Sequence, residues 1–162
     1  MKALTLIVAL VISTCLLSQE EKVKIYNPNS DANKQIDSAL TIAKQQKKHV
    51  LIQVGGNWCP WCVMLHKFYN TDFQVDSALK ANYVLLLVNY SPENKNLETL
   101  KKLDFPQRFG FPVLVILNSE GKRIHTQNTA YLEKGRGYDK DKLLDFLKAW
   151  SPAALDPDKY LK

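Results

Sequence analysis

The chain has 162 residues, and its 22 lysines and arginines against 16 acidic residues give it a formal net charge of +6. This length suits one domain with a single buried core. The lysines are scattered apart from short groups near predicted helix ends, where cations complement the backbone dipole, so the charge gives no reason to expect a nucleic-acid partner.

The first residues have the three-part layout of a secretory signal peptide. Lys2 precedes an apolar run over residues 3–17, and polarity changes abruptly after Ser18. The run is shorter than the roughly 20 apolar residues of a membrane-spanning helix. We therefore expect residues 1–18 to be a cleaved signal peptide and the protein to be exported to the periplasm. The alternative is a lipoprotein that is cut before Cys15 and anchored there.

The apolar pattern of the remaining chain predicts alternating strands and helices. A short strand at residues 23–26 is followed by a helix that Asp31 caps. Turn residues at 118–121 predict a hairpin that ends in an antiparallel strand. The other strands are expected at 49–54, 83–89 and 111–117, and the other helices at 60–68, 72–80, 97–103 and 139–150. This order predicts a mixed sheet covered by helices on both faces.

The expected cleavage leaves two cysteines, Cys59 and Cys62, which are three positions apart. So short a spacing closes almost no loop, and a purely structural bridge there adds little stability. The pair lies between a buried strand and a helix, where unpaired N–H groups and the helix dipole lower a thiol pKa. We expect Cys59, at the helix end, to be the more exposed nucleophile. Cys62, one turn deeper, is expected to be the resolving thiol.

The segment Trp58-Cys59-Pro60-Trp61-Cys62 resembles the active site of the thioredoxin superfamily, and Gly110-Phe111-Pro112 resembles its cis-proline segment. The similarity covers about residues 31–150 and is closest to the exported thioredoxin-like branch. It implies an α/β thioredoxin fold with a central mixed sheet of about four to five strands. It also implies a thiol-disulfide oxidoreductase with a redox-active Cys59–Cys62 disulfide and no bound cofactor.

Five residues around the cysteines are expected to contact the substrate. Trp58 flanks the nucleophile and Trp61 lies between the cysteines, although Trp58 could equally serve only to cover the sheet edge. Pro60 fixes the first helical turn. In the family, the proline that matches Pro112 is cis and leaves the preceding backbone, here at Phe111, free to pair with a substrate strand.

Gln53 departs from the family, because thioredoxins carry a buried aspartate there that acts as general base for the resolving thiol. An amide cannot take up that proton, so water or a carboxylate such as Glu120 or Glu133 would have to do so. His66 follows Cys62 by four residues. Three ligands from one helix rarely surround a tetrahedral ion, and no metal is expected.

The dipeptide between the cysteines has neither charge nor imidazole, so we expect stabilisation of the thiolate to come largely from the helix terminus. This favours a reductase or isomerase over an oxidant. Expected partners are protein thiols and disulfides and a membrane or soluble electron donor, and the protein is expected to be a monomer. The thioredoxin-like domain is expected over 19–150 and a tail over 151–162. The alternative function is a binding module or chaperone whose cysteines do not turn over.

Overall fold

The computed structural model describes residues 23–161. The signal peptide predicted at residues 1–18 and the alternative lipid anchor at Cys15 lie outside the described residues, and both stay predictions. Within the described range, every helix is too short or too polar to cross a membrane.

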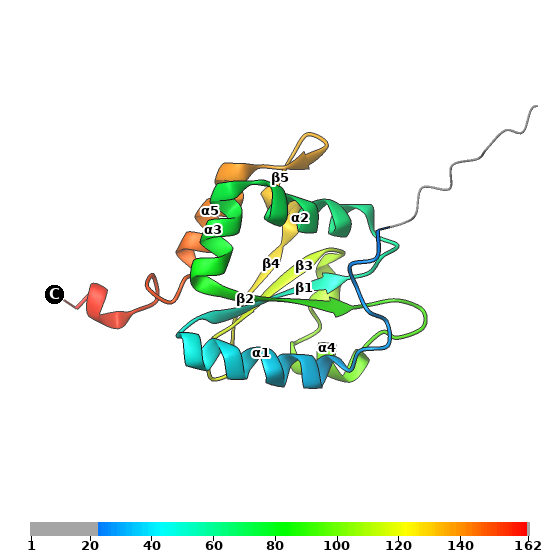
Figure 1. Cartoon of the computed structure of the whole chain (residues 1–162), viewed down its shortest axis with the longest axis horizontal. Helices are drawn as coiled ribbons and strands as arrows, with labels where there is room; N and C mark the ends of the chain where they lie inside the picture. Colours follow the sequence, from blue (N-terminus) through cyan, green and yellow to red (C-terminus); the bar gives the residue numbers. More distant parts are fainter. Residues whose placement is uncertain (1–22, 162) are drawn as a thin grey trace, which may run out of the picture.

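A mixed sheet forms the centre of the fold (Figure 1). Its four strands lie in the order β2 (Tyr83–Asn89), β1 (His49–Gly55), β3 (Val113–Leu117) and β4 (Arg123–Asn128). β1 runs parallel to β2 and antiparallel to β3, and β3 and β4 form the predicted hairpin. A turn of 3-10 helix, η2 (Thr129–Leu132), leads into a small ribbon of β5 (Glu133–Lys134) and β6 (Gly137–Tyr138). The predicted α/β architecture is thereby confirmed.

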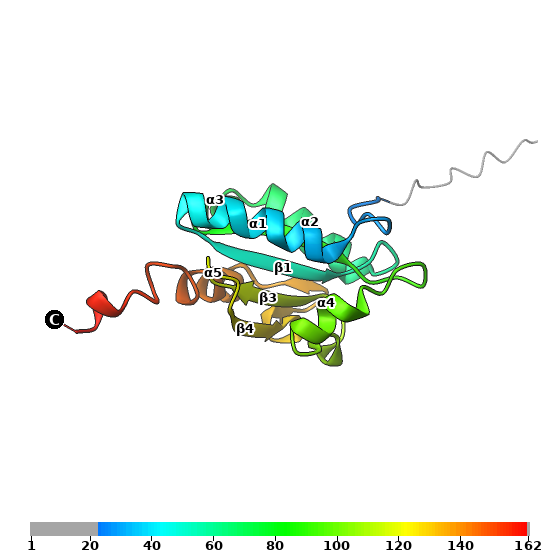
Figure 2. The same ribbon diagram turned by 90° about the horizontal axis from the view of Figure 1, so that it is seen from below.

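Helices cover both faces of the sheet, as predicted. One face carries α2 (Pro60–Thr71), α3 (Phe73–Asn82) and α5 (Lys140–Ala149), and the other carries α1 (Ala32–Gln46) and α4 (Leu97–Lys102). Figure 2, which views the molecule from below, shows α1 and α4 on the near face. The side chains of Asp31, Asp72 and Asp139 accept hydrogen bonds from backbone N–H groups in the first turns of α1, α3 and α5. Such N-caps fix where a helix begins.

The alternation of side chains along β1 decides which residues lie behind the cysteines. Successive residues of a strand point to opposite faces. Val50, Ile52 and Val54 belong to the core under α1 and α4, whereas Leu51 belongs to the core under α2, α3 and α5. Gln53 therefore faces the α2 side, where it is fully buried.

The strand predicted at residues 23–26 is wrong. That segment is not paired with a strand but is held by the side chain of Asn57, whose Oδ1 accepts hydrogen bonds from the N–H groups of Ile25 and Tyr26 at 2.8 and 2.9 Å. The Asn57 amide in turn donates to the Tyr26 carbonyl at 2.8 Å. These three bonds satisfy the backbone locally and place Tyr26 against the sheet.

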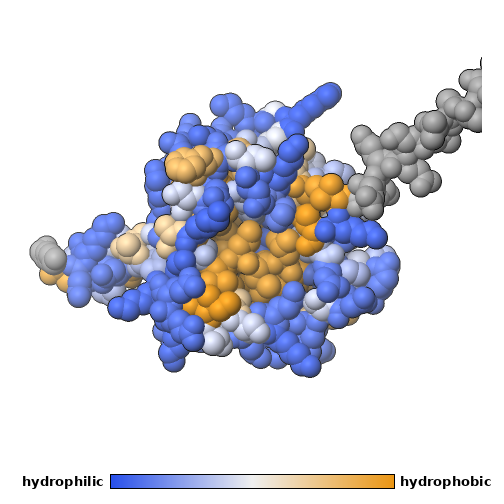
Figure 3. Space-filling model, in the orientation of Figure 1, coloured by the Kyte–Doolittle hydropathy of each residue, from blue (hydrophilic) through white to orange (hydrophobic). Residues whose placement is uncertain are grey.

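β2 is consequently an edge strand. Figure 3 shows hydrophobic residues gathered between the two helix layers, where β2 lies. Its central residues are only partly buried, and Ile42 beside it on α1 is 42% exposed. Within residues 23–161 no strand covers this edge of the sheet.

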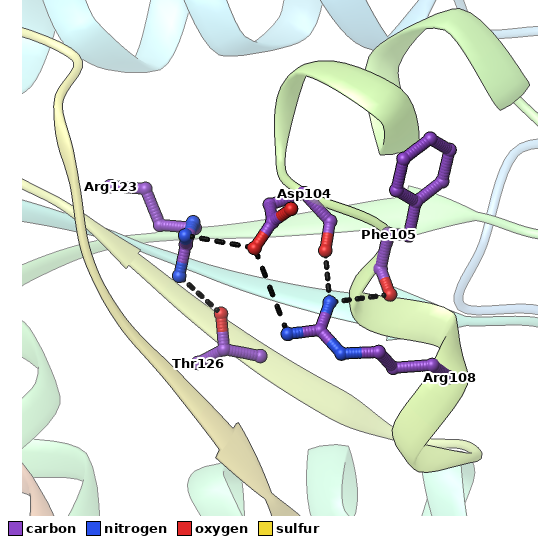
Figure 4. A network of polar contacts seen from close by, with 5 residues as sticks. All are labelled: Asp104, Phe105, Arg108, Arg123 and Thr126. Atoms are coloured by element: carbon purple, nitrogen blue, oxygen red, sulfur yellow. Dashed lines mark hydrogen bonds and ion pairs between the residues drawn. The ribbon is translucent and has the colours of Figure 1, made fainter.

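A polar network anchors the turn that leads to Phe111 (Figure 4). After α4, Asp104 and Phe105 adopt left-handed φ values of 61° and 51°, and a 3-10 turn, η1 (Pro106–Phe109), follows. The Arg108 guanidinium donates to the backbone carbonyls of both Asp104 and Phe105. The Asp104 carboxylate pairs with Arg123 of β4 at 3.1 Å. The network thus ties the approach to Phe111 to strand β4.

Beyond α5 the chain extends away from the sheet to a short 3-10 turn, η3 (Pro157–Lys159) (Figure 1). Ser151, the first residue of the predicted tail, is buried, and its hydroxyl donates to the Lys148 carbonyl at 2.9 Å. The boundaries predicted for the domain, 19–150, and for the tail, 151–162, stay predictions.

Candidate active site

Cys59 and Cys62 form a disulfide at the start of α2, with their Cα atoms 5.2 Å apart. Cys59 is the N-cap of this helix, and its Sγ accepts a hydrogen bond from the backbone N–H of Cys62 at 3.1 Å. Pro60 occupies the first helical position, where its missing N–H would have had no helical partner. The site therefore directs the backbone N–H of Cys62 at the sulfur of Cys59.

Both cysteines are shielded in the disulfide form, with Cys59 3% and Cys62 0% exposed. Neighbouring hydrophobic side chains cover Cys59 in this form, and its role as the more exposed nucleophile stays a prediction. The cluster comprises the two cysteines and Tyr26, against which Ile25, Trp61, Leu87 and Phe111 pack.

Trp58 and Phe111 come together from distant parts of the chain. Their rings meet edge to face with centroids 5.5 Å apart, and Phe111 also packs on Tyr90 at 4.7 Å. Trp58 remains 53% exposed while its Nε1 donates to the Tyr90 carbonyl at 2.7 Å. A groove of about 680 Å³ runs beside Trp58, with Tyr90 and Pro92 in its wall. The Phe111–Pro112 peptide bond is cis, and Pro112 is buried.

The two residues between the cysteines differ in their surroundings. Pro60 is exposed, whereas Trp61 is half-buried and packs edge-on against Tyr138 at 5.5 Å. The Tyr138 hydroxyl also donates to the Trp61 carbonyl at 3.3 Å. Substrate contact by Pro60 or Trp61 stays a prediction.

A buried polar group lies behind Cys62. The Gln53 amide Nε2 donates to the Tyr26 hydroxyl at 2.5 Å and to the Cys62 carbonyl at 3.0 Å. Gln53 Oε1 is buried and has no hydrogen-bond partner among the described residues. Tyr26 is only 3% exposed, and burial raises the pKa of its phenol well above the usual range. Gln53, at the position where the family carries an aspartate, thus forms a neutral pair with Tyr26.

Neither carboxylate considered from the sequence joins this pair. Glu120 lies in the β3–β4 turn, where its carboxylate accepts a hydrogen bond from the Ser119 hydroxyl at 2.7 Å. Glu133 lies in the β5–β6 ribbon. Among residues 23–161, no carboxylate hydrogen bonds to Gln53, Tyr26 or Cys62.

Sequence reasoning missed Tyr26, Gly55 and Asn57. Gly55 ends β1, and a Cβ atom there would lie 2.5 Å from Cys62 Sγ and 2.8 Å from the Tyr26 hydroxyl oxygen. Both distances are shorter than van der Waals contact. A glycine is therefore required where β1 passes Cys62.

Gly55→Ala is expected to lower the free energy of unfolding by about 1–3 kcal/mol, the usual cost of overpacking a core. It should also slow resolution by Cys62, because the new methyl group displaces its sulfur or Tyr26. Gly137→Ala is the matched control, since the nearest atom to a Cβ there is Met64 Sδ at 3.9 Å. Urea unfolding of both variants checks this prediction, and equal stabilities would contradict it.

The described residues hold no group of three or more His, Cys, Asp or Glu side chains that could bind a metal ion. His66 is half-buried on α2, and burial lowers its pKa.

Residues 36–136 match the family profile of a thioredoxin-like domain. The chain belongs to the thioredoxin-like family. No curated protein sequence matches it significantly. Together with its Cys59–Cys62 pair, the family assignment makes this a thiol-disulfide oxidoreductase-like domain.

Several solved structures superimpose on this chain. A disulphide isomerase from Xylella fastidiosa Temecula1 is 25% identical with a TM-score of 0.69, and the match covers 78% of this chain and 95% of that one. A thioredoxin from Thermus thermophilus is 21% identical with a TM-score of 0.51, covering 69% and 80%. The oxidised C-terminal domain of DsbD from Neisseria meningitidis is 19% identical with a TM-score of 0.51, covering 74% and 95%. The last two support the fold alone.

Proposed function

We propose that this thioredoxin-like protein exchanges disulfides with protein substrates, working as a reductase or isomerase. The observation that carries the proposal is the Cys59 sulfur at the N-terminus of α2, bonded to Cys62. In the reduced protein, the Cys59 thiolate attacks a substrate disulfide and expels one substrate sulfur as a thiolate. Cys62 then attacks Cys59 Sγ, releases the second substrate sulfur and forms the Cys59–Cys62 disulfide. Two electrons pass to the substrate.

The surroundings of the cysteines favour a reductase or isomerase over an oxidant. The side chains packed on the pair, those of Ile25, Tyr26, Trp61, Leu87 and Phe111, carry no charge at neutral pH. A strongly oxidising pair requires a strongly stabilised thiolate. Here the stabilisation comes from the helix terminus and the Cys62 N–H. The similarity to a solved disulphide isomerase supports the same direction.

A substrate chain is proposed to lie across Trp58 and Phe111. Trp58 offers a half-exposed ring fixed by its bond to the Tyr90 carbonyl, and the groove beside it continues this surface. Aromatic rings supply large apolar contact area with little loss of side-chain freedom. We expect unfolded or exposed apolar segments to bind best.

We further propose that the protein works as a monomer in the periplasm, where a membrane or soluble donor protein re-reduces it. The proposed location rests on the signal-like first residues in the sequence. Fractionation of cells after expression of the full chain tests it, and recovery in the cytoplasm with an intact first segment would contradict it.

A binding module or chaperone with inert cysteines is the alternative. Refolding assays separate these functions and the direction of exchange. The wild-type protein in a glutathione buffer should accelerate reactivation of scrambled ribonuclease more than oxidation of the reduced enzyme. An oxidant would show the opposite preference, and a binding module would accelerate neither through its cysteines.

A further inference from the structure

We propose that the Tyr26 hydroxyl, held by the Gln53 amide, donates a hydrogen bond to the Cys62 thiolate while Cys62 resolves the mixed disulfide. The inference rests on the proposed function, because it concerns a step of that exchange. Gln53 stands where the resemblance implies a buried aspartate, and the neutral Tyr26 hydroxyl that it holds acts on Cys62 instead of a carboxylate.

The geometry leaves the hydroxyl hydrogen of Tyr26 free. Gln53 Nε2 is a donor, so its bond to the tyrosine occupies a lone pair of the hydroxyl oxygen. The same oxygen and Cys62 Sγ both lie within 3 Å of the point where a Gly55 Cβ would be. Because Gly55 has no Cβ, no side-chain atom of this residue separates the hydroxyl from the sulfur. When the disulfide opens, the hydroxyl hydrogen can turn toward Cys62.

Gln53 fixes the distance between these two groups. Its amide donates both to Tyr26 and to the backbone carbonyl of Cys62, and it is fully buried on β1. Asn57 fixes the tyrosine from the other side through three bonds to the backbone of residues 25 and 26. Tyr26 is therefore held at both its hydroxyl and its main chain.

A donor is needed because Cys62 must become an anion at a buried position. Cys62 is 0% exposed, and burial without a hydrogen bond disfavours the thiolate. A hydrogen bond to an ionised group is stronger than one between neutral groups. Tyr69 and Tyr138 are the titratable neighbours of Tyr26, and burial also raises the pKa values of their phenols. The pocket thus stays neutral at physiological pH.

The step is balanced without a further reactant. The Cys62 thiol gives its proton to solvent, and the resulting thiolate attacks Cys59 Sγ as the bond from Cys59 to the substrate sulfur breaks. The released substrate thiolate takes up a proton through solvent. Tyr26 keeps its own proton throughout, so it stabilises charge and does not act as an acid.

Stopped-flow reaction of the reduced protein with 5,5′-dithiobis(2-nitrobenzoate) separates the steps. Attack by Cys59 releases the first thionitrobenzoate, and resolution by Cys62 releases the second. Tyr26→Phe should leave the first phase within about twofold and slow the second about tenfold at pH 7. The pKa governing the second phase should rise by about one unit, which matches a tenfold change.

Tyr83→Phe is the matched control, because Tyr83 is also buried and its hydroxyl donates to the Leu147 carbonyl at 2.7 Å, away from the cysteines. It should leave both phases unchanged. A second measurement is the Cys62 pKa, read from thiolate absorbance in Cys59→Ser with and without Tyr26→Phe. An unchanged second phase and pKa, or equal slowing of both phases, would overturn the proposal. Absence of both phases in the wild type would instead refute the proposed function.

Discussion

Cys59→Ser is expected to lower insulin reduction with dithiothreitol by about 10³-fold or more, to the rate without protein. The reason is that a serine hydroxyl at the helix terminus stays protonated at neutral pH, so the backbone N–H of Cys62 has no thiolate to stabilise. The fold should survive, because the lost disulfide closes only a short loop.

Circular dichroism and urea unfolding supply the control for this variant, with the reduced wild-type protein as reference. The two should unfold within about 1 kcal/mol of each other. Turnover above a tenth of the wild-type rate in the folded variant would show that Cys59 is not the nucleophile.

Cys62→Ala is expected to stop catalysis after one attack and to accumulate a mixed disulfide at Cys59. Cys59 keeps its place as the N-cap of α2, so its thiolate can still form. The backbone N–H at position 62 also remains. Without the second sulfur, the covalent complex is released only by an external thiol.

Trapping from a periplasmic extract, followed by reducing and non-reducing gels, measures this outcome. Protein complexes should appear only without reductant, and Cys59→Ser combined with Cys62→Ala should remove them. Trapping through Cys62 in Cys59→Ser at an equal yield would reverse the assigned roles.

Local sequence patterns predicted most of the fold. Asp31 and the following apolar spacing located α1, and the short apolar run after His49 located β1. These signals act over a few residues, through capping and burial, so they predict helices and strands without knowledge of tertiary contacts. Cys59 at a helix N-terminus followed from the same reasoning, and the structure confirms it.

The neutral pair behind Cys62 could not be predicted in the same way. Tyr26 reaches the site because Asn57, 31 positions later, binds its backbone. Residues 23–26 have the alternation of a strand, yet side-chain hydrogen bonds satisfy their backbone instead. The need for a glycine at position 55 could not be predicted either, since it comes from two atoms on other segments. Such constraints arise only when distant segments pack.

The most direct test of the account is the redox equilibrium of the wild-type protein with glutathione, followed by alkylation of free thiols and mass spectrometry. We predict one reversible two-electron couple at Cys59 and Cys62, with a potential between about −180 and −270 mV, the range of isomerases and thioredoxins. A value near the roughly −120 mV of the strongest oxidant would contradict the proposed direction. A disulfide that stays closed in the folded protein under these buffers, and under dithiothreitol, would contradict the redox function itself.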